Sequence, residues 1–342
     1  MERFFIYSTH YKEKDLWIVK DYMNTLEHLY KQEKILSKYK LRNVEALKLE
    51  DIATCFSKKY FSRLKNLSTS NELTPSNQPI RDTIFDELIA CNGMLTAIEL
   101  AFKNNGLAFH LGSSCHHATR YREGGNCYIN TIMVGIEQSR RKLNLKKFLI
   151  IDLDVHFPDG TYDSYTSDPS VFQISLHGWG IFPGRGWINK IGSRKAKNTK
   201  LNIPLPAGTT GELYITALKK FLPPFIEKSD PEVVIYQAGV DVLHTDKLGN
   251  LKLTIEDVFE RDKYVYELVS KKYSYPLVTI TGGGYSPDSY KARINTVAAL
   301  AGEEIVFKEN LQIKVSGSTE IKFKKWIQDF EIFLLNKDFY KV

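Results

Sequence analysis

Residues 148–156 have the sequence FLIIDLDVH, and this stretch decides the expected fold and site. Its first four residues are apolar on both alternating faces, which is typical of a parallel strand covered by helices on both sides. Asp152, Asp154 and His156 then follow at alternating positions. Because side chains two residues apart on an extended backbone share a face, we expect these three to converge where the strand ends.

Two neighbouring buried carboxylates lose solvation and repel each other, and a divalent cation removes both costs. An isolated D-x-D at a strand end would more simply cap the next helix or turn. The histidine two residues later favours a metal site over that simpler interpretation.

Similar apolar runs recur along the chain and alternate with helical patterns. The expected strands are 107–111, 148–153, 171–176, 201–203, 233–237 and 277–281. The helical candidates between them are 83–104, 128–141, 211–226 and 254–271. This alternation predicts an α/β fold, a three-layer α/β/α domain with a mostly parallel, doubly wound sheet. In such sheets ligands bind beyond the carboxyl ends of the strands.

We expect one domain over residues 1–342, with three parts. Residues 1–80 are polar and divergent, with helical stretches near 14–39 and 43–57 and an exposed loop over 66–79. Residues 81–304 would form the catalytic core. The tail, 305–342, has apolar residues at helical spacing and is expected to pack on the core, although a membrane or partner surface is the alternative.

Composition excludes several classes of protein. With 43% hydrophobic and 25% charged residues, the 342-residue chain is neither collagen, wholly disordered nor a coiled coil. The charge of +7 is spread along the chain, so we expect no nucleic-acid partner. No apolar run approaches a membrane span, and the N-terminus has no signal-peptide pattern. Four cysteines without framework spacing suggest free thiols and a cytoplasmic location, with specialised secretion or nuclear entry left open.

Three further motifs follow apolar runs. Cys115-His116-His117 could line a cavity, although an isolated His-His pair is more often a solvated loop. Asp241, after QAGV, could be a ligand or only a helix N-cap. Gly282-Gly283-Gly284 would let the backbone pass close to a ligand and present Tyr285, or would simply form a tight turn.

Taken together, these motifs predict metal-assisted hydrolysis of an amide or ester. One histidine and two aspartates leave an open coordination position for water, as in catalytic zinc sites. The same donors also accept Fe²⁺ or Co²⁺. The two other histidines supply acid and base groups, and a tyrosine hydroxyl can donate to an oxyanion.

In this order the motifs resemble the histone deacetylase family of zinc amidohydrolases, which have the arginase-like α/β fold. The resemblance covers roughly residues 82–300, and the stretches 232–251 and 277–285 are most similar to the class IV branch. It implies a zinc-dependent deacetylase or deacylase that acts on acylated lysine in a protein or peptide.

The resemblance also implies a role for each matched residue. Asp154, His156 and Asp241 would bind zinc. His117 would be the general base, paired with Asp159, and His116 its electrostatic partner, paired with Asp152. Tyr285 would stabilise the oxyanion. The residues matched to the substrate channel are Gly125, Asn126, Phe182 and Gly283, and those matched to a family potassium (K⁺) site are Asp152, Asp154, His156, Ser175 and Leu176.

Two departures from the family pattern bear on geometry and specificity. Phe157-Pro158 replaces the usual His-Gly after the metal histidine, which puts the turn geometry in question, while Asp159 and Gly160 are retained. Asn126 replaces an aromatic wall of the acyl-lysine channel, and Phe182 matches the opposite wall. A wider channel leads to the hypothesis that acyl groups longer than acetyl are accepted.

Three other functions compete with this interpretation. A binuclear arginase-like site would need a carboxylate two residues after His156, and that position is Pro158. Hydrolysis of a small acylated amine, such as an acylpolyamine, would use the same machinery and stays open. A non-catalytic binding module would be expected to have lost ligands or the tyrosine, and all are present. The oligomeric state is not indicated.

Overall fold

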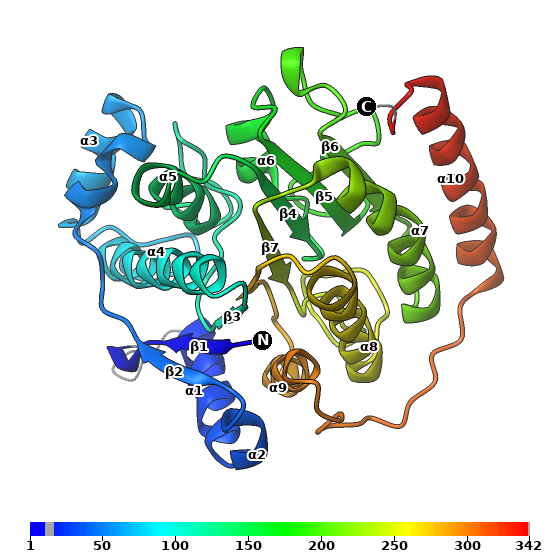
Figure 1. Ribbon diagram of the computed structural model, residues 1–342, viewed down its shortest axis with the longest axis horizontal. Coiled ribbons are helices and arrows are strands. Elements are labelled where there is room, and N and C mark those ends of the chain that lie inside the picture. Colours follow the sequence, from blue (N-terminus) through cyan, green and yellow to red (C-terminus); the bar gives the residue numbers. More distant parts are fainter. Residues whose placement is uncertain (11–16, 341–342) are drawn as a thin grey trace.

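The computed structural model describes residues 1–10 and 17–340, which contain a single eight-stranded parallel sheet (Figure 1). The strand order is β2-β1-β3-β8-β7-β4-β5-β6. The strands are β1 (Arg3–Tyr7), β2 (Lys40–Asn43), β3 (Leu107–His110), β4 (Phe148–Asp152), β5 (Val171–Gly178), β6 (Lys200–Leu205), β7 (Val233–Ala238) and β8 (Leu277–Thr281).

Helices flank the sheet on both sides. The α-helices are α1 (Trp17–Tyr30), α2 (Glu33–Leu36), α3 (Lys58–Leu67), α4 (Ile80–Lys103), α5 (Thr131–Leu143), α6 (Asp159–Tyr165), α7 (Gly211–Ser229), α8 (Ile255–Tyr266), α9 (Ser289–Ala301) and α10 (Gly317–Asn336). The other helical segments are the 3₁₀ turns η2 (Leu49–Cys55) and η3 (Arg194–Ala196) and the π-helix η4 (Glu267–Lys272).

The core lies on both faces of the sheet. Every residue of β3 to β8 is buried, which explains their two-sided apolar sequences. Helix α4 packs against α5 and the strands β1, β3 and β8, while α7, α8, α9 and α1 pack in succession on one another. No helix within the described residues has the length and apolar character that a membrane span requires.

The topology places four loops together at the carboxyl end of the sheet. Strands β3, β8, β7 and β4 are neighbours in that order and all run in the same direction. The segments after them therefore leave the sheet side by side, and they carry the histidine pair, Tyr285, Asp241 and the Asp154–His156 stretch.

The sequence prediction was incomplete in the N-terminal part. The six expected strands are present, but β1 and β2 extend the same sheet and were not predicted. The helix expected over 43–57 was wrong, because this segment follows β2 and forms only the 3₁₀ turn η2. The helix expected over 14–39 corresponds to α1 and α2, and its residues 14–16 lie outside the described residues. Helices α3, α6 and α9 were also missed.

The C-terminal tail packs on the molecule through α10. Phe323, Phe330 and Leu334 are buried, and the Phe330 ring lies 5.0 Å from that of Phe221 on α7. Trp326 contacts the rings of Trp179 and Trp187, which flank the loop carrying Phe182. Helix α10 therefore supports a loop next to the predicted site.

Candidate metal centre and active site

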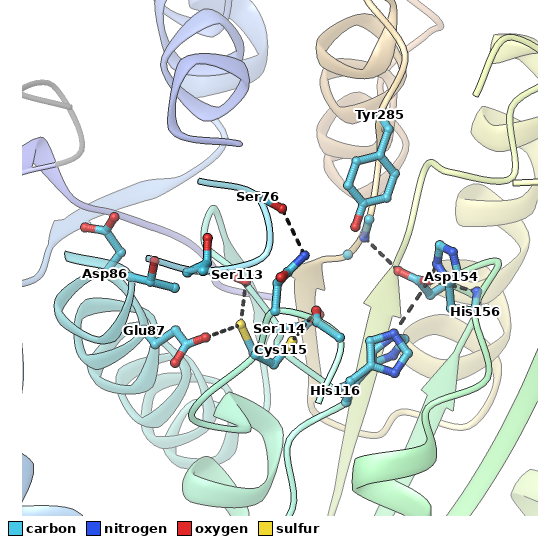
Figure 2. A pocket seen from close by; sticks show the side chains of 18 of the residues that line it. Ser76, Asp86, Glu87, Ser113, Ser114, Cys115, His116, Asp154, His156 and Tyr285 are labelled. Carbon is cyan, nitrogen blue, oxygen red and sulfur yellow. Dashed lines mark hydrogen bonds and ion pairs between the residues drawn. The ribbon is translucent and has the colours of Figure 1, made fainter. Parts of the chain in front are cut away.

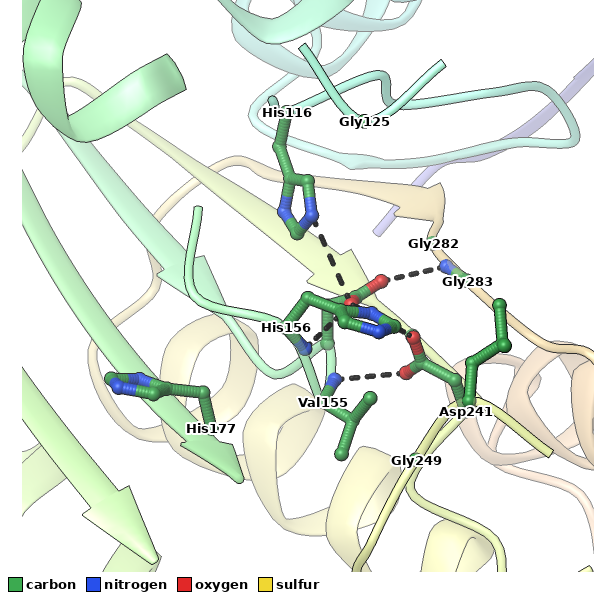
Figure 3. Close-up of polar contacts among 12 residues, drawn as sticks. His116, Gly125, Val155, His156, His177, Asp241, Gly249, Gly282 and Gly283 are labelled. Carbon is green, nitrogen blue, oxygen red and sulfur yellow. Dashed lines mark hydrogen bonds and ion pairs between the residues drawn. The ribbon is translucent and has the colours of Figure 1, made fainter. Parts of the chain in front are cut away.

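The three predicted zinc ligands lie together in the segments after β4 and β7. One ligand atom from each of Asp154, His156 and Asp241 lies within 4.8 Å of the others, and all three side chains are buried. His156 Nδ1 is 3.1 Å from Asp154 Oδ1 and 3.0 Å from Asp241 Oδ2 (Figure 3). We call these three residues the triad.

Backbone amides hold the triad carboxylates in place. Val155 N donates to Asp241 Oδ1 at 2.8 Å, and Gly283 N donates to Asp154 Oδ2 at 2.7 Å (Figure 3). A Cβ at Gly283 would lie 2.1 Å from Asp241 Oδ2, so only glycine allows this approach. Gly282 and Gly283 therefore allow close packing against the triad and are more than turn residues.

The electrostatics of the triad suit a cation between the carboxylates. Burial and the neighbouring Asp154 raise the pKa of Asp241 to about 8. Burial lowers the pKa of the His156 imidazole, but both carboxylates outweigh burial and raise it to about 10. Without a metal, the positive charge that the two buried carboxylates require comes from protons on His156 and, below about pH 8, on Asp241. The residues fit a divalent ion because the ion would supply that charge in their midst.

The histidine pair follows β3 and has an aspartate behind each ring. His116 Nδ1 lies 3.1 Å from Asp152 Oδ2, and His117 Nδ1 lies 2.7 Å from Asp159 Oδ1. The two Nε2 atoms are 3.0 Å apart. All four side chains are buried. The two histidine–aspartate pairings expected from the sequence are therefore present as contacts.

The two histidines have opposite pKa shifts. Burial and the adjacent His116 lower the pKa of His117 to about 4. Burial acts in the same direction on His116, but Asp152 and Asp154 outweigh it and raise the pKa to about 9. At neutral pH His116 is therefore a cation and His117 is neutral; with the His117 Nδ1–H directed at Asp159, its Nε2 carries the lone pair that can accept a proton.

Pro158 forms the turn that precedes Asp159, the partner of His117. Asp159 N donates to Phe157 O at 2.8 Å, and Pro158 has φ −76° and ψ 66°, which is an inverse γ-turn. Proline supplies this φ without strain and its missing N–H is not required. Helix α6 then begins at Asp159. The Phe157-Pro158 departure is thus compatible with the expected position of Asp159.

Tyr285 lines the same cavity as the histidines and the triad. The cavity has a volume of about 390 Å³. Figure 2 shows the tyrosine hydroxyl directed into it, on the side where Asp154 and His156 lie. Burial, followed by Asp241, raises the pKa of Tyr285 well above its ordinary value, so the phenol stays protonated and can donate. The ring centroid lies 6.3 Å from that of His156.

The cavity continues away from the triad to α4 (Figure 2). Its lining there is mostly small and polar: Tyr22, Thr83, Asp86, Glu87, Ser113, Ser114, Cys115 and Cys127. Glu87 is buried and accepts hydrogen bonds from Tyr128 N, Ile129 N and the Cys115 thiol. It therefore ties α4 to the loops on both sides of the histidine pair.

Two of the predicted channel residues, Gly125 and Phe182, lie against His117, whereas Gly283 lies against the triad. The Phe182 ring centroid is 4.8 Å from that of His117, and a Cβ at Gly125 would lie 2.7 Å from the His117 ring. Asn126 lines the cavity, donates to Ser76 Oγ at 3.1 Å, and has φ 62°, which asparagine tolerates better than most residues. Their contact with substrate stays a prediction.

Of the residues matched to a potassium site, Asp152, Ser175 and Leu176 are neighbours on β4 and β5, and Asp154 and His156 follow β4. Asp152 pairs with Ser175 in the sheet register, and Leu176 follows. The Ser175 hydroxyl lies 2.9 Å from His177 Nδ1. Potassium binding here stays a prediction.

Sequence reasoning missed Gln237, Glu87 and His177. The Gln237 amide nitrogen donates to Asp154 Oδ2 at 3.3 Å and lies 2.9 Å from His116 Nδ1, so this side chain stands between the triad and the histidine pair. His177 lies apart from the triad (Figure 3), and its Nε2 contacts Gly186 O at 3.0 Å. A polar residue closing an apolar strand was the one available signal for Gln237.

Comparisons with known proteins agree on one family. The Histone deacetylase domain family matches residues 19–301. Histone deacetylase 14, chloroplastic, of Arabidopsis thaliana is 28% identical over 84% of this chain and 71% of its own length. Histone deacetylase 1 of Homo sapiens is 28% identical over 69% of this chain and 50% of its own length.

Another relative is matched over less of its length, and one solved structure supports the fold. Histone deacetylase 6 of Arabidopsis thaliana is 31% identical over 61% of this chain but only 43% of its own length. The crystal structure of the HDA15 HD domain superposes with a TM-score of 0.81 at 18% identity, over 99% of this chain and 97% of that one. The expected α/β fold with a parallel sheet is confirmed.

Proposed function

This chain belongs to the histone deacetylase family and is a hydrolase that acts on amides, and from that premise we propose that it removes acyl groups from lysine side chains in proteins or peptides. The observation that carries the proposal is a single cavity lined by His117, Tyr285 and the triad residues Asp154 and His156. General base, oxyanion donor and metal ligands are the groups that amide hydrolysis requires. The class IV assignment and the cytoplasmic location stay predictions from the sequence.

We propose Zn²⁺ as the ion of the triad, in keeping with a metal-dependent family. Two carboxylates and one imidazole would hold the ion with a position left open, and zinc would supply Lewis-acid chemistry there, activating a water and polarising a carbonyl. Fe²⁺ and Co²⁺ accept the same donors, so metal analysis of the purified protein must decide between them.

His117 is the proposed proton carrier. Nε2 of its neutral imidazole accepts a proton as water attacks the amide carbon, and Nε2 then returns that proton to the leaving lysine amine. Asp159 orients the ring through Nδ1, and the cationic His116 adds positive charge next to the developing oxyanion. The Tyr285 hydroxyl donates a hydrogen bond to the same oxyanion.

Replacing Asp159 with asparagine tests the orientation of the base. We expect kcat to fall by about 10- to 100-fold, the usual effect of losing such a hydrogen-bonding partner. The carboxylate raises the pKa of His117, so its loss lowers that pKa further and moves the acidic limb of the pH–rate profile to lower pH. Asp163→Asn, on the same helix but paired with Arg185, is the matched control. An unchanged kcat and pH profile would contradict the role of Asp159.

We further propose that acyl groups longer than acetyl are accepted. A cavity of about 390 Å³ lies within the range of roughly 300–1,000 Å³ that encloses whole small ligands, whereas acetyl ends in a single methyl group. The cavity extends from the triad to Thr83 and Glu87 on α4. Position 126, where the family has an aromatic side chain, is an asparagine in this chain.

A substrate panel tests this proposal. Acetyl-, hexanoyl- and myristoyl-lysine peptides and an acetylpolyamine would be compared by kcat/KM, and we expect a longer acyl-lysine peptide to be preferred. Thr83→Phe should reduce turnover of the longer acyl groups at least tenfold relative to acetyl, because the ring fills the cavity next to α4. Thr83→Val keeps the volume of threonine and is the matched control. If the parent enzyme preferred the acetyl-lysine peptide, the proposal of longer acyl groups would be wrong. If it preferred the acetylpolyamine, the proposal of a lysine substrate would be wrong.

A further inference from the structure

A fully buried arginine lies behind the triad. Arg261 is on α8 and is 0% exposed. Its Nη1 donates to Gly239 O at 2.7 Å and to Leu153 O at 3.3 Å. Its Nε donates to Asp262 Oδ1 at 2.7 Å. One guanidinium therefore joins a carboxylate on its own helix to two backbone carbonyls that directly follow β4 and β7.

The two carbonyls belong to the segments that carry the triad carboxylates. Leu153 directly precedes Asp154, and Gly239 lies two residues before Asp241. The paired register of β4 and β7 ends at Asp152 and Gln237, so both carbonyls lie beyond it. A last backbone hydrogen bond, from Leu153 N to Gln237 O at 3.1 Å, closes the pairing, and Arg261 Nη1 bridges the two segments directly after it.

Stability alone does not account for this ion pair. Transferring a charge from water to the interior is costly, and replacing a buried ion pair by apolar residues is often neutral or stabilising. Here Asp262 is also held by the hydroxyls of Tyr236 and Thr296, Thr296 lying on α9. The carboxylate is thus anchored to β7 and α9, and it fixes the direction in which the guanidinium points.

We propose that Arg261 is a positioning residue that sets the separation of Asp154 and Asp241 by clamping the backbone before each of them. The inference rests on the metal triad proposed above. The contacts of Nη1 with the Leu153 and Gly239 carbonyls fix the backbone before each carboxylate whether or not an ion is bound. A preorganised pair binds the ion without a further conformational cost, so the clamp raises metal affinity.

A double variant separates clamping from charge compensation. Arg261→Met/Asp262→Asn removes both charges, leaves no unpaired buried ion, and keeps an amide for the Tyr236 and Thr296 hydroxyls. We expect its zinc dissociation constant, measured by chelator competition, to rise by about 10- to 100-fold, the usual cost of losing support behind metal ligands. Its thermal midpoint should stay close to that of the parent in the absence of metal.

Arg261→Lys is the second variant, because it retains the positive charge next to Asp262. A lysine ammonium lacks the planar fork that reaches a carboxylate and two carbonyls at once. We therefore expect zinc binding to weaken here as well, by a smaller factor. Ile226→Ala is the control for general destabilisation. It leaves an empty space at a buried position of α7 and should not change the zinc affinity.

The outcomes distinguish this inference from the proposal on which it rests. If the parent binds one zinc ion and both Arg261 variants bind it within threefold of the parent, the clamp alone is overturned. Equal weakening in Ile226→Ala would also overturn it, because the effect would then be nonspecific. If the parent binds no zinc, the metal triad fails and the clamp fails with it.

Discussion

Asp241→Asn is expected to abolish zinc binding and amide hydrolysis together. An amide oxygen is a neutral and weaker ligand than a carboxylate, and Asp241 contributes one of three proposed protein ligands from a fully buried position. We expect stoichiometric zinc in the parent, none above background in the variant, and turnover reduced by at least about 1,000-fold, comparable with the loss of a central catalytic group. Zinc content and kcat/KM would be measured on the same preparations.

The stability of the metal-free variant shows whether the loss is due to misfolding. The folded-state pKa of Asp241 is raised to about 8, above the ordinary value near 4 of the unfolded chain. A carboxyl group with a raised pKa destabilises the fold progressively as pH rises from about 4 to 8. Asparagine carries no such cost, so the metal-free variant should be at least as stable as the metal-free parent at pH 8.

Asp257→Asn provides the control for this substitution. Asp257 caps α8 through Thr254, away from the triad, so its variant should retain zinc and activity. Full zinc occupancy in Asp241→Asn would contradict the proposed triad. A metal-free Asp241→Asn variant that unfolds more readily than the parent at pH 8 would instead indicate a structural role for the carboxylate.

The sheet could be predicted where strand sequences are governed by burial. Strand β8 was predicted with its observed bounds because LVTIT is buried on both faces. Strand β2, KLRN, is exposed at all four positions and forms the edge of the sheet, where lysine and arginine are common. No apolar pattern marks such a strand. Its pairing with β1 depends on tertiary structure that the local sequence does not encode.

The candidate site was predictable for a related reason. The carboxyl ends of parallel strands lie at the same end of the sheet, so the polar residues after several apolar runs had to approach one another. Residues that support the site from behind gave no such signal. Arg261 lies within a helical pattern and Glu87 on a long helix, and each contributes through contacts with backbone far away in sequence. Motifs at strand ends therefore indicated the side chains that gather at the cavity, but not the residues that contact them from behind.

Tyr285→Phe is expected to retain zinc but to lower kcat by about 100-fold or more. The phenylalanine ring can keep the contact with the His156 ring, so only the hydroxyl is lost. A hydroxyl that donates to the oxyanion is worth about 2.7–4 kcal/mol in the transition state, which corresponds to about 10²- to 10³-fold in kcat. Its pKa is raised well above the ordinary value, so it remains a donor throughout the working pH range.

The division of the effect between kcat and KM tests the role itself. The oxyanion forms only as water attacks, so losing its donor should lower kcat and kcat/KM by similar factors and leave KM nearly unchanged. Tyr264→Phe, on α8 away from the cavity, is the matched control and should behave as the parent. If Tyr285→Phe instead raised KM at constant kcat, the hydroxyl would bind the ground-state substrate and the oxyanion role would be wrong. Activity within threefold of the parent would exclude both roles, and His116 together with the metal would then have to stabilise the oxyanion unaided.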